Sequence, residues 1–289
     1  MLNRRRLTAS LLSLFVLPLA ARAQQPAVTP SADLAGIAHV AIRVHDLDAS
    51  VAYYEKLGFI RAFALSREGK VYEAFIKIDD QQYLELYPVE DKNTQIGFLH
   101  VCFYGRDLPA VHDYYVAHGL TPNNVRTAGA GNLLFTMPGP ATLTGPQNME
   151  YTQYMPASMH SKAIGQFLGP DRISTHLIGV EIGFTNPAEA AAFYKDKAGF
   201  IPQAPTRMPS RGPQTTFALP GNPSEFIKLV SSAELGFRSR IVLAADTSTA
   251  AAKLKQQGVE FKQGGGELDS HDLLLTDPDG NQIILKATK

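Results

Sequence analysis

The stretch Gly36–Phe59 (GIAHVAIRVHDLDASVAYYEKLGF) predicts a strand, a short turn and an amphipathic helix. Apolar residues alternate with other residues from 38 to 44, which is typical of a strand with one buried face. The segment that follows carries apolar residues at helical spacing, so it predicts a helix packed on that face. His39 and Arg43 lie on the opposite face of the strand, where an inward-pointing histidine and arginine need partners or a ligand.

The same pattern occurs four times along the chain. In the second copy, residues 98–120, His100 precedes a tyrosine of the predicted helix by 15 positions, as His39 does in the first copy. The third and fourth copies span residues 178–200 and 239–261. Copies at intervals of about 60 to 80 residues indicate an internal repeat, in which each module is a strand, a helix and further strands.

The first 23 residues differ from the rest of the chain. Three arginines at positions 4–6 precede the apolar run 11–20, and residues 21–23 (ARA) form a small-x-small cleavage site. This arrangement is typical of a secretory signal peptide, and the apolar run is too short to span a membrane. The adjacent arginines also resemble a twin-arginine signal. We therefore expect residues 1–23 to direct export to the periplasm or the extracellular space, with residues 24–35 as a tether.

Composition narrows the possible partners. With 45% hydrophobic and 19% charged residues, the 289-residue chain is typical of a soluble globular protein with one large domain or two smaller ones. Removal of the predicted signal peptide takes away four arginines and no acid, which leaves 23 basic and 27 acidic side chains. No basic stripe is present, so neither nucleic acid nor, after cleavage, a membrane is an expected partner. Cys102 is the only cysteine, which excludes an intramolecular disulfide.

The repeats also predict domain boundaries. Modules one and two are expected within residues 36–155, and modules three and four within residues 173–289, joined by a linker at 156–172. In module two we expect a strand at 120–126. Residues 137–146 are rich in glycine and proline and are expected to form a loop.

Repeated strand–helix–strand–strand–strand modules, with a histidine in the first strand and a glutamate in the last, resemble the vicinal oxygen chelate superfamily. This superfamily includes glyoxalase I, methylmalonyl-CoA epimerase, extradiol dioxygenases and fosfomycin- and bleomycin-resistance proteins. The resemblance covers residues 36–287, and the turn 277–281 (DPDGN) is typical of the family's last strand. It implies an α+β fold in which four βαβββ modules form two paired, cupped, barrel-like mixed sheets with the helices outside, around one divalent metal ion.

Four residues occupy equivalent inward positions in modules one and two. Strand alternation places Glu85 on the same inward face as its neighbours Tyr83 and Tyr87, and it places Glu150 likewise in the last strand of module two. Taken singly, each histidine is more often a hydrogen-bonded core residue and each glutamate a solvated strand residue. In register, however, they form a mixed nitrogen and oxygen set suited to zinc, nickel, cobalt, manganese or iron: His39, Glu85, His100 and Glu150.

Modules three and four lack this set. The repeat places Gly179 and Lys228 at the two positions in module three, and Ser239 and Ile284 in module four. The second half is therefore expected to be free of metal. Pairing of module one with module two assembles the whole set, so we expect contiguous modules to pair.

Several neighbouring residues have inward positions with two interpretations. Arg43 could bind an anionic substrate or pair with an inward carboxylate. Tyrosines could line a substrate pocket or simply pack in the core; they are Tyr83, Tyr87, Tyr104 and Tyr154. Cys102 lies on the face of His100 and is expected to be a small buried thiol. His160, in the linker, could reach the site as part of a lid.

The resemblance implies that the metal binds a small-molecule substrate through two adjacent oxygen atoms. Two glutamate ligands resemble the arrangement of glyoxalase I, a lyase, in which Glu150 (which we favour) or Glu85 would move a proton. An extradiol-type Fe(II) dioxygenase is the first alternative, because it needs two histidines and one carboxylate. A non-catalytic binding protein of the resistance type is the second. A monomer is possible, since four modules complete both cups.

Overall fold

The chain forms two eight-stranded mixed sheets, one from each half. The computed structural model describes residues 32–204, 215–235, 238–265 and 268–287. The expected signal peptide and most of the expected tether lie outside these residues. The end of the expected tether is part of the first strand, because β1 (Leu34–Val44) begins at Leu34.

In the first sheet, the opening strands of modules one and two lie side by side at the centre. The strand order is β2-β3-β4-β1-β5-β8-β7-β6, so each module supplies one half of the sheet. The strands are β1, β2 (Ile60–Arg67), β3 (Lys70–Lys77), β4 (Tyr83–Pro88), β5 (Gly97–Gly105), β6 (Arg126–Thr127), β7 (Leu133–Thr142) and β8 (Gly145–Gln153).

The second sheet repeats this arrangement with modules three and four, in the order β10-β11-β12-β9-β13-β16-β15-β14. Its strands are β9 (His176–Phe184), β10 (Ile201–Pro202), β11 (Thr215–Leu219), β12 (Asn222–Ser231), β13 (Ser239–Ala245), β14 (Phe261–Gly265), β15 (Leu268–Thr276) and β16 (Gln282–Ala287). The predicted α+β class with two cupped mixed sheets is confirmed. Neither sheet closes into a barrel among the described residues, because each order ends in two edge strands.

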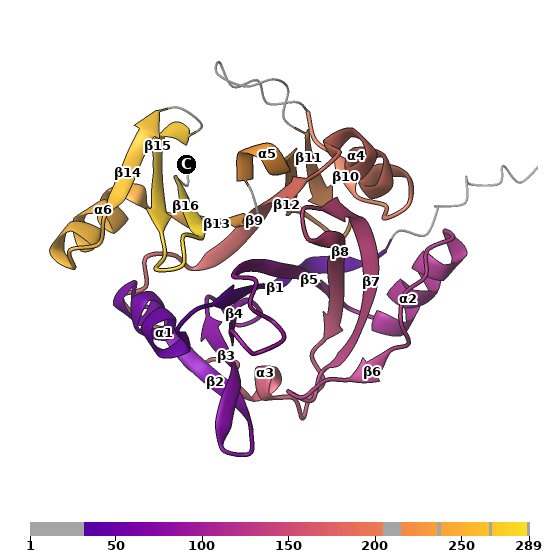
Figure 1. Ribbon diagram of the computed structural model, residues 1–289, viewed down its shortest axis with the longest axis horizontal. Helices are drawn as coiled ribbons and strands as arrows, with labels where there is room; N and C mark the ends of the chain where they lie inside the picture. The colour runs from indigo at the N-terminus through magenta and orange to yellow at the C-terminus, as the bar shows by residue number, and fades with distance from the viewer. Residues whose placement is uncertain (1–31, 205–214, 236–237, 266–267, 288–289) are drawn as a thin grey trace, which may run out of the picture. The chain divides into compact units, whose positions relative to one another are not determined.

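Four long helices follow the first strands of the modules and lie outside the sheets (Figure 1). They are α1 (Leu47–Lys56), α2 (Leu108–Ala117), α4 (Pro187–Asp196) and α6 (Thr247–Gln256). Each begins after an Asp or Asn whose side chain accepts a backbone N–H of the first turn. Three of these helices carry a buried tyrosine, namely Tyr54 in α1, Tyr115 in α2 and Tyr194 in α4. The 15-residue spacing from strand to helix therefore reflects the fixed distance from the strand through the cap to the buried face.

Two expectations for module two are wrong. The predicted strand at 120–126 is reduced to the two residues of β6, since Pro122 has no N–H to donate to a ladder. The predicted loop at 137–146 is instead a hairpin, in which β7 and β8 continue to a two-residue turn. A register shift between Pro138 and Ala141 accommodates the proline, and Gly145 takes a positive φ of 120° where β8 begins.

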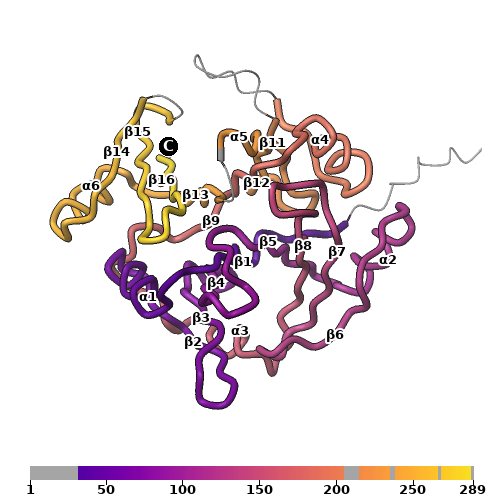
Figure 2. The backbone as a smooth tube through the Cα atoms, viewed as in Figure 1, coloured from indigo at the N-terminus to yellow at the C-terminus, as the bar shows by residue number. Residues whose placement is uncertain are grey.

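Two short helices lie outside the repeats. They are α3 (Met159–Lys162), within the predicted linker, and α5 (Ser232–Leu235). Figure 1 shows α3 between the two arms of the first sheet, with β2 and β3 on one side and β8 on the other. Figure 2 follows the chain from β8 through α3 to β9. The linker therefore covers the open side of the first cup.

The two halves share one apolar core, and equivalent tyrosines connect them. The Tyr54 hydroxyl donates to Asp277 Oδ2 at 3.0 Å, in the turn before β16. The Tyr194 hydroxyl donates to Gln147 Oε1 at 2.8 Å, in β8. Within the described part of the chain, no helix is long and apolar enough to cross a bilayer.

Candidate metal centre

The four predicted ligands come from the four central strands of the first sheet. His39 lies on β1, Glu85 on β4, His100 on β5 and Glu150 on β8, and these strands are neighbours in the order β4-β1-β5-β8. Ala41 of β1 is the register partner of both Glu85 and His100. Because an alanine occupies this central position, the larger side chains on either side can meet over it. The structure thus brings all four together on the concave face.

The donor atoms lie close enough to share one ion. His39 Nε2 lies 3.1 Å from His100 Nε2 and 3.2 Å from Glu150 Oε1. His100 Nε2 lies 3.8 Å from Glu150 Oε1 and 3.8 Å from Glu85 Oε2. Metals such as zinc bind nitrogen and oxygen donors at about 2.0–2.2 Å, so two donors of one ion lie roughly 3 to 3.5 Å apart. The residues therefore fit a single divalent ion with modest adjustment.

Burial keeps the two imidazoles of this cluster neutral, so they contribute no positive charge. It lowers the pKa of His39 to about 3 and that of His100 to about 4, so both imidazoles are neutral, the form that ligates metal. Burial, with help from Glu73 and Glu150, raises the pKa of Glu85 well above its usual range. Among the described residues, the ion-pair contacts of Glu85 and Glu150 are with these imidazoles alone. A bound cation would supply the missing charge.

The geometry around Glu85 is compatible with two roles for its carboxylate. Its Oε1 lies 3.0 Å from His39 Nδ1, on the side of the ring away from His100. This contact lacks hydrogen-bond geometry, and no other described residue forms a hydrogen bond with His39 Nδ1. Glu85 could therefore bind an ion through Oε2 or orient His39 through Oε1, as carboxylates orient ligating histidines elsewhere.

A further carboxylate, which we did not predict from the sequence, adjoins the cluster. Glu73 of β3 is buried, and the Tyr87 hydroxyl donates to its Oε1 at 2.6 Å and to Glu85 Oε2 at 3.2 Å. Burial raises the pKa of Glu73 to about 7. The sequence carried one indication of this residue, because Glu73 is a glutamate within the largely apolar stretch 71–76.

Cys102 is buried, as expected from the sequence, and it also adjoins the centre. Its sulfur forms a close group with a nitrogen of His39 and an oxygen of Glu150, all within 4.8 Å of one another. Burial and the Glu150 carboxylate raise the pKa of the thiol well above its usual range. This raised pKa favours the neutral thiol as long as no cation is bound.

The residues considered as substrate contacts are spread over the two ends of the cup. Arg43 lies at one end, where its Nη1 donates to the Gln95 carbonyl at 3.4 Å. Tyr83 is fully buried at the other end, and its hydroxyl has no hydrogen-bond partner in the part of the chain that the structure describes. Tyr154 donates to the Gln81 carbonyl at 2.9 Å, and the half-buried Tyr104 packs on Tyr154 with ring centroids 5.1 Å apart.

The second cup holds an ionic cluster at the equivalent place. Glu181 Oε1 lies 2.6 Å from Lys228 Nζ, and Glu181 Oε2 lies 3.0 Å from Arg240 Nη1. Arg240, not Ser239, takes the position of His100, because it pairs with Glu181 as His100 pairs with Ala41. The sequence repeat misplaced this position by one, since β13 has one residue fewer than β5 before the helix cap.

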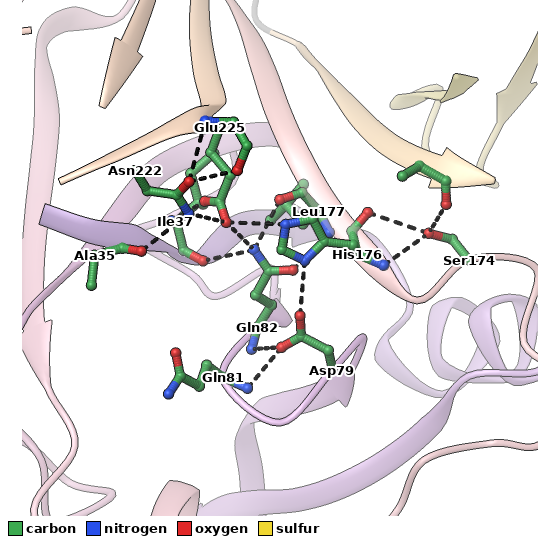
Figure 3. A network of polar contacts seen from close by, with 12 residues as sticks. Ala35, Ile37, Asp79, Gln81, Gln82, Ser174, His176, Leu177, Asn222 and Glu225 are labelled. Atoms are coloured by element: carbon green, nitrogen blue, oxygen red, sulfur yellow. Dashed lines mark hydrogen bonds and ion pairs between the residues drawn. The ribbon is translucent and has the colours of Figure 1, made fainter. Parts of the chain in front are cut away.

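A polar network joins the halves beside the first cup (Figure 3). Its centre is the buried Glu225 of β12, whose carboxylate accepts from Asn222 Nδ2 at 3.0 Å and from Gln82 Nε2 at 3.2 Å. It also accepts the backbone N–H of Ile37. His176 bridges Glu225 and Asp79, at 3.2 and 3.0 Å. The network lines a cavity of about 480 Å³ and fixes β1 and β4 just before His39 and Tyr83.

Comparisons with known proteins agree with this architecture. A model of the Glyoxalase/Bleomycin resistance protein/Dioxygenase superfamily matches residues 36–148. No match was found among curated proteins. Similar solved structures include a catechol 2,3-dioxygenase, with a TM-score of 0.62, 15% sequence identity and coverage of 89% of this chain and 89% of that chain.

Two further solved structures resemble the chain over most of its length. The Mn(II)-bound glyoxalase from Novosphingobium aromaticivorans has a TM-score of 0.62 and 14% identity, with 88% of this chain and 82% of that chain covered. The 2,3-dioxygenase LapB from Pseudomonas sp. KL28 has a TM-score of 0.60 and 13% identity, with 90% and 94% covered. At these identities, the similarity establishes the shared fold alone.

Proposed function

We propose that the chain is a divalent-metal-dependent enzyme, and the match of residues 36–148 to a model of the Glyoxalase/Bleomycin resistance protein/Dioxygenase superfamily supports this proposal. It would bind a small molecule through two neighbouring oxygen atoms and move a proton at the adjacent carbon, as a lyase or isomerase does. The observation that carries this proposal is the meeting of two neutral imidazoles and two carboxylates at one point of the first cup.

In this proposal, the ion would be held by His39, His100, Glu150 and Glu85. When bound, it would act as a Lewis acid on a substrate oxygen. Glu150 is the better candidate for the base. Its side chain is 13% exposed, whereas that of Glu85 is 4% exposed. Tyr87 also donates to Glu85 and restrains it, so Glu150 has more freedom to reach a substrate proton.

Ring cleavage by an extradiol-type Fe(II) dioxygenase is the second candidate. The position of Glu85 favours it, because Oε1 faces the outer nitrogen of His39 and leaves His39, His100 and Glu150 as a three-donor group. Such a group with open positions is the usual site of non-haem Fe(II) oxygenases. A non-catalytic binding protein, which would need no metal, is the remaining alternative.

Metal analysis tests the proposal. We would measure the metal content of the purified protein, of Glu85→Gln and of Glu150→Gln by mass spectrometry, with Glu55→Gln on the exposed face of α1 as the matched control. We expect about one ion per wild-type chain and a loss in both centre variants. Retention in Glu85→Gln alone would favour the three-donor dioxygenase. A wild-type chain that takes up no divalent ion would refute the proposal.

Reaction assays then separate the two chemistries. Proton transfer predicts deuterium exchange at the carbon next to the carbonyl of α-hydroxyketones in D₂O, followed by NMR, and loss of this exchange in Glu150→Gln. Ring cleavage predicts oxygen uptake with catechol on the Fe(II)-loaded protein. We also propose that the protein is exported and works as a monomer, which cell fractionation and light scattering would test.

A further inference from the structure

His160 lies in an unusual environment for a histidine. It belongs to α3, in the linker that covers the first cup, and only 2% of the residue is exposed. Its ring stacks on Tyr154, with centroids 4.3 Å apart and planes 7° apart. It meets the rings of Tyr83, Phe63 and Phe75 edge-on at 5.1, 5.1 and 5.3 Å. His160 is thus enclosed in a cage of four aromatic rings.

Three polar atoms of this aromatic cage have no hydrogen-bond partner among the described residues. These are the two ring nitrogens of His160 and the hydroxyl of Tyr83, all of which are buried. Native proteins leave few buried polar groups unpaired, because each one loses its hydrogen bonds to water on folding. Burial lowers the pKa of His160 to about 3, so its imidazole is neutral and offers one donor and one acceptor.

The linker is held in place by contacts that do not involve the His160 ring. The buried Lys77 donates to the Ala163 carbonyl just after α3, and Asp80 accepts the Gly165 N–H at 2.7 Å. At the start of α3, the Met159 N–H donates to the Ala130 carbonyl at 2.8 Å. Since these bonds fix α3, the aromatic cage would not need the nitrogens of His160 for its own stability.

The aromatic cage adjoins the metal centre. Tyr83 is the register partner of His39 on the neighbouring parallel strand, and such strands lie about 4.8 Å apart. Tyr83 also shares the concave face with Glu85, two residues further along β4. His160 packs on Tyr83, which is the neighbour of His39 on the adjacent strand. His160 therefore lies at the end of the cup away from Glu73 and Tyr87.

We propose that His160 and the Tyr83 hydroxyl determine substrate specificity. They would form hydrogen bonds with an oxygen or nitrogen atom on a flat, unsaturated part of the substrate. This inference rests on the proposed function, since the substrate's chelating oxygens would lie at the metal centre. The rings of the cage would contact the flat part, and the unpaired nitrogens and hydroxyl would gain the partner that they lack. A sugar or an amino acid would leave the ring faces poorly matched.

The test uses three hydroxamates, which chelate metals through two neighbouring oxygens. Acetohydroxamate supplies the chelating group alone, benzohydroxamate adds a flat ring, and 3- and 4-hydroxybenzohydroxamate add a polar atom to that ring. We would measure their Kd values on the Zn²⁺-loaded full chain by calorimetry, for wild type, His160→Phe and Tyr83→Phe. His160→Leu, which also has no hydrogen-bonding side-chain atom, replaces His160→Phe if the latter does not fold.

We expect the two hydroxybenzohydroxamates to bind the wild type more tightly than benzohydroxamate does. In His160→Phe, this gain in affinity should be about tenfold smaller, which corresponds to the loss of one hydrogen bond. Acetohydroxamate binding and zinc content should stay within twofold. His160→Phe should also unfold at the same urea concentration or a higher one, because it removes unpaired buried atoms, whereas a structural histidine would make the variant less stable.

The outcomes separate this inference from the proposed function. If the wild-type chain takes up no zinc and does not bind acetohydroxamate, the metal proposal fails. If zinc and acetohydroxamate bind, but the variants keep the wild-type preference among the ring compounds, the role of His160 is refuted and the metal centre stands.

Discussion

The bridge made by His176 should make the stability of the fold depend on pH. Its Nδ1 lies 3.0 Å from Asp79 Oδ2 in the first half, and its Nε2 lies 3.2 Å from Glu225 Oε1 in the second. Hydrogen bonds to Asp79 and Glu225 raise the pKa of His176 from 6.5 to about 9, against the opposing effect of burial. A pKa raised on folding stabilises the folded state fully below pH 6.5, and this contribution is lost as the pH rises through 9.

The magnitude follows from the size of the shift. A rise from 6.5 to about 9 corresponds to at most about 3.4 kcal/mol, at 1.36 kcal/mol per pKa unit. The His176 side chain is 37% exposed, so solvent screens its ion pairs and we expect about 1–2 kcal/mol. Below pH 6.5, His176→Gln should therefore be less stable than the wild type by about 1–2 kcal/mol.

Urea unfolding from pH 6.0 to 9.5 measures this difference, with His45→Gln as a control at an exposed position. The difference between wild type and His176→Gln isolates the bridge, because both proteins share the other titrating groups, including Glu73. We expect the gap to close between pH 6.5 and 9. A gap that stays constant over this range would refute the assignment of the stabilisation to a charged His176.

Three further predictions concern the linker, a turn and the metal centre. Lys77→Met should lower the free energy of unfolding by about 1–3 kcal/mol, because the Ala163 carbonyl loses its buried donor; urea titration measures this. Gly58→Ala should lower it by at least about 1 kcal/mol, because Gly58 has a φ of 86° and a new Cβ would lie 2.5 Å from the Asp171 carbonyl oxygen. Zn²⁺ at 100 times its Kd should stabilise the wild type by about 2.7 kcal/mol and leave His39→Ala unchanged, as thermal unfolding would show.

The sequence was most informative where one short segment determines the structure. The 15-residue spacing from His39 or His100 to a helix tyrosine is set by a strand, a cap and two turns of helix, and these local features occur as expected. Strand alternation also placed Glu85 and Glu150 on the concave face, because neighbouring side chains of a strand point to opposite sides.

Features that depend on distant parts of the chain were not predictable in the same way. The role of Glu73 depends on which face of β3 adjoins Glu85 and Tyr87, and the position of His160 depends on how the linker crosses the cup. Glycine and proline within 137–146 predicted a loop, but pairing with β8 overrides their weak strand propensity. Arg240 was misplaced because a single-residue deletion leaves the apolar pattern of β13 unchanged.

The two cups use the same strand positions with opposite charge balance. In the second cup, Glu181 stands where Ala41 stands in the first, and its carboxylate is neutralised by Lys228 and Arg240. A divalent cation there would have to displace two ammonium or guanidinium groups already in contact with the acid. In the first cup, Glu85 and Glu150 face imidazoles that burial keeps neutral, so the carboxylates have no such competitor. The same electrostatic argument that supports an ion in the first cup therefore opposes one in the second, and Zn²⁺ should bind the whole chain at one site.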